Sequence, residues 1–203
     1  EYFYQTLRNT GYNGDIVVAK TKNKFEKFEH LLRRLKATVY TPELTCSDEL
    51  ADHIRCIFTG YESVTKGISY SVNMLRIFMY KQWAMKYDKE AIIMLSDAND
   101  VVFQSNPFNY QPKHWAPPRY QLTVFQEAYP NKMIYRCGFN SGWIESCYGT
   151  EALNSVKHNP VSCSGTVMGS RDGVLVLVSI LIYVMVQISV IDRVLHWYIV
   201  YDI

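Results

Sequence analysis

The sequence lacks a large excess of charge of either sign, and this absence limits the partners that we consider. Its 203 residues include 21 Lys and Arg and 19 Asp and Glu, a formal net charge of +2. Nucleic-acid-binding domains usually carry a concentrated basic surface instead. Apolar residues make up 48% and charged residues 20%, as in ordinary globular proteins. We therefore expect a packed domain that binds no nucleic acid.

Cysteine pairs of the form C-x-x-C are also absent, which argues against a zinc ribbon. The five cysteines are Cys46, Cys56, Cys137, Cys147 and Cys163. Cys46 and Cys56 flank a polar segment and could form a disulfide in an oxidising compartment. The alternative is two partly buried, unpaired thiols. No Asn-x-Ser/Thr sequon occurs, so glycosylation gives no evidence of the compartment.

An initiator methionine and a signal peptide are missing at Glu1. The first residues have the pattern of the interior of a helix. We expect residues 1–203 to be a single domain, cut at both ends from a longer chain.

Short apolar runs alternate with amphipathic stretches, which predicts a layered α/β fold with a mostly parallel central sheet flanked by helices. Strands are predicted at 16–18, 37–40, 91–95 and 121–125. Helices are predicted at 23–36 and 71–87, where apolar residues recur three and four positions apart. The strand at 91–95 is expected to be central, and the polar residues 41–66 are expected to form a long loop.

The longest uncharged run covers the 18 residues 174–191. This length is at the lower edge of what spans a membrane. However, Ser179, Tyr183 and Gln187 recur every four residues and would form one polar stripe along a helix. A helix packed on the sheet is the favoured interpretation, and a membrane span and β-strands are the alternatives.

The most informative segment is the apolar run 92–95, which ends in Ser96-Asp97-Ala98-Asn99-Asp100. A buried strand of this kind delivers carboxylates to the edge of the sheet, where ligands bind in open α/β folds. Carboxylate and amide oxygens suit Mn²⁺ or Mg²⁺ better than zinc, and such a cation can hold a diphosphate. These residues predict a metal-dependent enzyme acting on a nucleotide-sugar. As the structural alternative, the two acids cap the turn after the strand.

Three later segments add candidate binding residues. Residues 139–142, Phe-Asn-Ser-Gly, are expected to form a small turn whose polar side chains reach a ligand. Residues 162–170 are small and precede a predicted helix, so their backbone N–H groups could face an anion. Asp192 and His196 lie on a predicted final helix. The structural alternatives are an ordinary turn, a tight loop and a surface histidine.

Together, these motifs resemble the glycosyltransferases of the GT-A fold, which use nucleotide-diphosphate sugars as donors. Residues 96–108 are similar to the strand-plus-acid motif of that family, and residues 139–142 to its FNSG step. Residues 165–170 resemble the later small-residue loop and helix start, and 191–196 resemble the "DQ" helix. The acids here are spaced Asp97-x-x-Asp100, and Arg193 stands where the family has Gln.

The resemblance implies a GT-A-like layered fold and the metal-dependent transfer of a sugar to an acceptor hydroxyl. The residues that would hold Mn²⁺ or Mg²⁺ are Asp97, Asn99 and Asp100. The catalytic carboxylates would be Glu127 and Asp192, for which a salt bridge or a cap is the structural alternative. The donor or acceptor would contact Asn140, Ser141, Gly142, Ser164 and Gly165.

The resemblance also implies partners and a location. The partners would be a nucleotide-sugar donor and a glycan or protein acceptor. The location would be the Golgi or ER lumen, with a membrane anchor outside this segment. One rival interpretation is a nucleotide-sugar or carbohydrate-binding domain of the same fold without catalysis, indicated by Arg193 and a missing first strand. The other is a membrane-embedded interaction protein built around residues 174–191.

Overall fold

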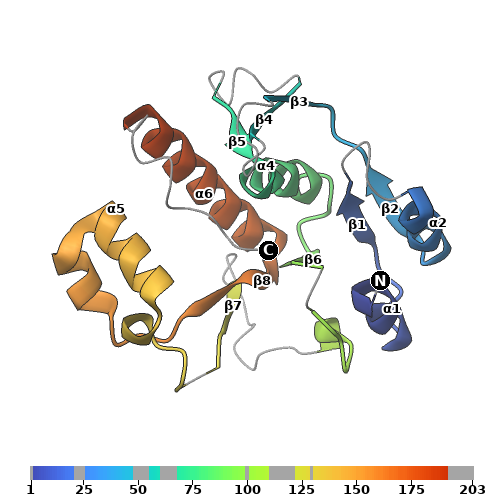
Figure 1. Cartoon of the computed structure of the whole chain (residues 1–203). Coiled ribbons are helices and arrows are strands. Elements are labelled where there is room, and N and C mark those ends of the chain that lie inside the picture. The colour runs from blue at the N-terminus through green and yellow to red at the C-terminus, as the bar shows by residue number, and fades with distance from the viewer. Residues whose placement is uncertain are drawn as a thin grey trace. The chain divides into compact units, whose positions relative to one another are not determined.

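The computed structural model describes residues 2–20, 26–47, 55–59, 68–98, 101–109, 122–128 and 130–191. The chain divides into two compact units. Unit 1 consists of residues 1–76 and 96–118, and unit 2 consists of residues 77–95 and 119–203. Figure 1 labels the helices and strands of both units.

Unit 1 begins with a short helix, which is followed in the chain by a β-α-β arrangement. The elements are α1 (Tyr2–Asn9), β1 (Ile16–Ala19), α2 (Glu26–Arg34) and β2 (Ala37–Tyr40). Strands β1 and β2 pair in parallel, as expected when a helix connects two neighbouring strands. Apolar residues of all four elements form one buried cluster: Phe3, Tyr4, Leu7, Ile16, Leu32 and Ala37. The predicted strands and the described part of the predicted helix are confirmed.

A disulfide-linked hairpin follows in unit 1. Its strands are β3 (Leu44–Ser47) and β4 (Arg55–Phe58), and β5 (Tyr70–Ser71) pairs with β4. Cys46 lies opposite Cys56 in the antiparallel register, and a disulfide joins them across a Cα–Cα distance of 4.0 Å. The predicted loop at 41–66 was therefore wrong at both strands. The polar composition gave no sign of these strands, because backbone pairing and the Cys46–Cys56 disulfide, not an apolar pattern, order this segment.

Helix α4 (Val72–Ala84) begins in unit 1 and ends in unit 2. It confirms the helix predicted at 71–87, and its Leu75 and Phe78 are buried. A three-stranded sheet is formed by β6 (Ile92–Ser96), β7 (Leu122–Gln126) and β8 (Ser162–Ser170). The order is β6-β8-β7, so β8 is the middle strand in place of the strand predicted as central.

The prediction of a mixed α/β fold is confirmed, but the described sheets are small and mostly antiparallel. Strand pairs β3–β4, β4–β5 and β7–β8 are antiparallel, and only β1–β2 is parallel among the pairs whose register is described. The alternation of strands and helices does not specify which strands become neighbours. A long connection between β7 and β8 allows either direction of pairing.

The 3₁₀ turn η2 (Ile134–Arg136) and helix α5 (Gly138–Val156) fill the connection between β7 and β8, and a first 3₁₀ turn, η1 (Pro107–Asn109), lies between β6 and β7. Helix α5 bends at Gly149, whose φ of 85° is readily adopted only by glycine. Residues 139–142 form the first turn of this helix, so the small turn predicted there was wrong. The loop predicted at 162–170 was also wrong, because these residues form β8.

Helix α6 (Arg171–Ile191) follows β8 directly and confirms a helix for the uncharged run. Val174 and Val178 are fully buried and pack with Ala84 of α4 in unit 2. Tyr183 of the predicted polar stripe is 66% exposed. Within the parts of the chain that the structure describes, no helix has the length and apolar character needed to cross a bilayer.

Candidate functional site

Asp97 follows the last residue of β6, where the sequence predicted a carboxylate. Its Oδ1 accepts a hydrogen bond from Nη1 of Arg76, on α4, and the two side chains form an ion pair. The Asp97 side chain is 37% exposed and that of Arg76 is 24% exposed. Ser96 Oγ also donates to the Asp97 carbonyl oxygen at 3.0 Å. Strand β6 thus presents a half-buried carboxylate with an arginine beside it.

One hydrogen-bond donor of Arg76 finds no acceptor in the described part of the chain. Its Nε is buried and has no partner among the described residues. An unsatisfied buried N–H costs about 1–3 kcal/mol, so an oxygen acceptor at this position would be favourable. Arg76 was not among the predicted site residues. The available signal was a single charged residue within the apolar stretch 74–79 of a helix.

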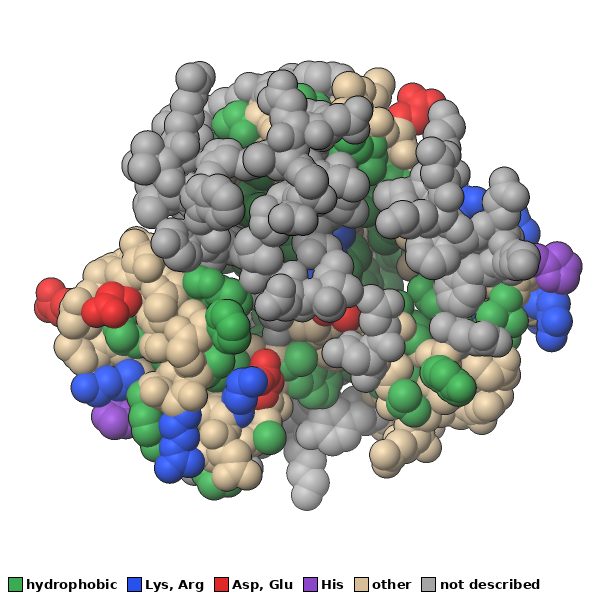
Figure 2. Space-filling model, viewed as in Figure 1, with side chains coloured by type: hydrophobic (Ala, Val, Ile, Leu, Met, Phe, Trp, Pro, Cys, Tyr) green, Lys and Arg blue, Asp and Glu red, His purple; other side chains and the backbone are tan. Residues whose placement is uncertain are grey.

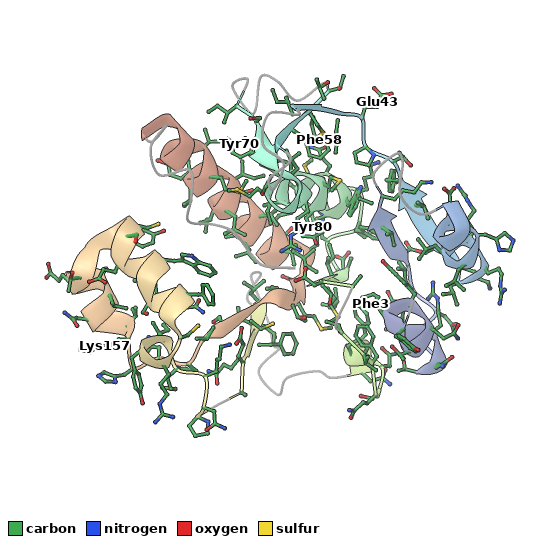
Figure 3. All side chains as sticks on the ribbon, viewed as in Figure 1. Phe3, Glu43, Phe58, Tyr70, Tyr80 and Lys157 are labelled. Carbon is green, nitrogen blue, oxygen red and sulfur yellow. A yellow bond between two sulfur atoms is a disulfide. The ribbon has the colours of Figure 1, made fainter. Side chains whose placement is uncertain are left out.

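The segment that follows Asp97 is anchored in the core of unit 1. Val101 and Phe103 pack against the cluster that contains Phe3, and the Phe103 N–H donates to Thr6 Oγ1 at 3.1 Å. Figure 3 labels Phe3 on α1. Further along, the ring of Phe108 stacks on Tyr12 with 4.7 Å between centroids. The residues directly after the acids are therefore anchored to the core of unit 1.

Two of the three predicted metal ligands, Asn99 and Asp100, lie outside the described residues. The third, Asp97, has its second carboxylate oxygen, Oδ2, without a hydrogen bond from any described residue. Among the residues that the structure describes, no three or more His, Cys, Asp or Glu side chains gather in a group that could hold a metal.

Glu127 follows β7 in unit 2, at the strand end where it was predicted. Its Oε2 lies 3.4 Å from Nζ of Lys132, and its backbone N–H donates to the carbonyl of Val161 at 2.9 Å. This salt bridge is the structural alternative that the sequence left open for Glu127. The other predicted catalytic carboxylate, Asp192, lies outside the described residues.

Residues 139–142 lie at the start of α5 around the sulfur of Cys137. The Asn140 side-chain amide donates to Cys137 Sγ at 3.0 Å, and Ser141 Oγ donates to the Cys137 carbonyl at 3.0 Å. Hydrogen bonds from the backbone and side chain of Asn140 lower the pKa of the Cys137 thiol, and nearby Lys132 adds to this effect. At Gly142, an added Cβ would meet nothing within 4 Å, so close approach does not explain this glycine.

Ser164 and Gly165 belong to β8, so their backbone lies in a strand and not in the anion-facing loop that was predicted. The Ser164 side chain lies outside what the structure describes. The described candidate residues thus divide between the units, with Asp97 in unit 1 and the others in unit 2. Comparisons of the chain with protein-family models, with curated proteins and with solved structures find no match.

Proposed function

We propose that this chain is part of a metal-dependent glycosyltransferase that moves a sugar from a nucleotide-diphosphate donor to an acceptor hydroxyl. The observation that carries this proposal is the half-buried carboxylate of Asp97 at the end of β6. The order of the motifs at 96–108 and 139–142 supports it, as does the unpaired Nε of Arg76 beside the carboxylate. The fold that we propose is a GT-A-like layered fold.

The donor set fits a hard divalent cation. Asp97 keeps one carboxylate oxygen free of Arg76, and Asn99 and Asp100 would add an amide and a second carboxylate. When bound, Mn²⁺ or Mg²⁺ supplies Lewis-acid stabilisation of the departing diphosphate. Arg76 would donate its free N–H to a phosphate oxygen and neutralise part of its charge.

The remaining predicted residues keep their proposed roles. Glu127 and Asp192 would orient the acceptor hydroxyl or accept its proton. The residues that would contact the donor sugar or the acceptor are Asn140, Ser141, Gly142, Ser164 and Gly165. The disulfide between Cys46 and Cys56 supports the proposed oxidising location, the Golgi or ER lumen.

The test is donor binding by isothermal titration, using uridine and guanosine diphosphate sugars with Mn²⁺ or with a chelator. Asp97→Ala is expected to weaken Mn²⁺-dependent binding at least tenfold, because it removes a ligand oxygen and its charge. Asp88→Ala removes a carboxylate from an exposed turn and should leave the affinity unchanged. Equal donor affinity for Asp97→Ala and the unchanged protein would exclude the metal role.

The ion pair between Arg76 and Asp97 favours a second candidate function, a domain that binds nucleotide-sugars without transferring them. The arginine already compensates the carboxylate, so this site would bind a diphosphate through Arg76 without a cation. In that case, the chelator would leave donor binding intact, and Arg76→Ala would weaken it more than Asp97→Ala. Release of free nucleoside diphosphate on adding Mn²⁺ would instead support the transferase.

A further inference from the structure

Two distant parts of the sequence meet beside the C-terminal end of α5 in unit 2. The backbone N–H groups of Ile134 and Tyr135 donate to the carbonyls of Asn159 and Lys157, each at 3.0 Å. These bonds fix η2 against the residues that follow α5. Figure 3 labels Lys157 at this end of the helix, and Figure 2 shows Lys, Arg and His side chains gathered there.

A cationic and an aromatic side chain lie beside the ring of Tyr135 at this junction. The Arg136 guanidinium carbon lies 5.4 Å from the centroid of the Tyr135 ring, and the His158 ring lies 5.5 Å from it. Tyr135 is 48% exposed, and Arg136 and His158 are also exposed. The cation–π contact restricts the guanidinium, and its N–H groups can still donate to a ligand.

The positive charge of this surface is not neutralised by described side chains. Lys157 Nζ donates to the neutral Asn154 Oδ1 at 3.0 Å, and no described carboxylate pairs with Arg136 or Lys157. The nearby Lys132, in contrast, forms its ion pair with Glu127. Two free cations beside an exposed aromatic ring would bind an anion that is attached to a partly apolar body.

We propose that Tyr135, Arg136, Lys157 and His158 form a binding surface for an acidic glycan. The carboxylate or sulfate groups of such a glycan would contact Arg136 and Lys157, and a sugar ring would pack on Tyr135. A nucleic acid also carries anionic groups attached to rings. An acidic glycan is favoured because the disulfide in unit 1 is typical of an oxidising compartment and the net charge is only +2. The inference does not depend on the proposed sugar transfer.

The experiment measures binding of the chain to heparin, used as a sulfated polysaccharide, and to neutral dextran at one fixed salt concentration. Arg136→Gln and Lys157→Gln are each expected to weaken heparin binding roughly fivefold, the upper range for one exposed charge contact. Lys89→Gln is the matched control, because it removes the same charge from an exposed turn outside the surface. Binding to dextran is expected to be undetectable.

Three results would overturn this proposal. Heparin could fail to bind, or Lys89→Gln could weaken binding as much as Arg136→Gln, which would indicate a diffuse charge effect. Single-stranded DNA could also bind as tightly as heparin at the same salt, which would indicate a nucleic-acid surface. Unchanged donor binding in the Asp97→Ala variant would refute the metal role and leave this inference unaffected, so failures of the two proposals can be told apart.

Discussion

The disulfide between Cys46 and Cys56 should supply much of the stability of the hairpin in unit 1. The two cysteines are 10 residues apart, and loop closure over that length removes about 9 cal/mol/K of entropy from the unfolded chain. At 25 °C this entropy corresponds to about 2.7 kcal/mol. Since about 1.4 kcal/mol is a factor of ten, opening of the hairpin should become about a hundredfold more frequent without the bond.

Cys46→Ser is the cleanest way to break this bond. Cys46 is the exposed partner, whereas Cys56 is fully buried, so the variant leaves the buried sulfur in place and opens no cavity. Hydrogen exchange measured by mass spectrometry on peptides that cover β4 reports the opening directly. We expect about a hundredfold faster exchange there, and the same change when the unchanged protein is reduced.

Cys147→Ser serves as the control, since Cys147 is a free thiol in unit 2. Its exchange at β4 should match that of the unchanged protein. If the oxidised protein and the Cys46→Ser variant exchanged at β4 within about threefold of each other, the loop-closure argument would be refuted.

Two further predictions concern unit 2. Val178→Ala, at a fully buried position of α6, should lower the free energy of unfolding by about 2 kcal/mol, whereas Val176→Ala at an exposed position should change it by less than about 0.5 kcal/mol; urea unfolding compares them. The lowered pKa of Cys137 means that more thiolate is present near neutral pH, and the thiolate is the reactive form. Asn140→Ala should therefore shift alkylation of Cys137 to higher pH, and Asn154→Ala on the same helix should not; identical pH profiles for both variants would contradict the assigned cause.

Some contacts at the candidate sites were beyond the reach of sequence patterns. The ion pair of Arg76 with Asp97 joins residues 21 positions apart, and the hydrogen bond from Tyr135 to Lys157 spans a whole helix. Side-chain periodicity describes one element at a time, so it cannot say which elements meet. The aromatic and basic surface went unrecognised for this reason.

Local patterns did predict the elements whose cause is local. Strands β1, β2, β6 and β7 and helices α2, α4 and α6 follow from apolar periodicity, and the carboxylate of Asp97 does stand at the end of its strand. The start of α5 and the strand β8 were mistaken for a turn and a loop, because small residues are compatible with those structures as well. Pairing between distant parts of the chain decided two of the elements that the sequence missed. Strand β8 is ordered by its register with β7, and the hairpin of β3 and β4 by the disulfide between Cys46 and Cys56.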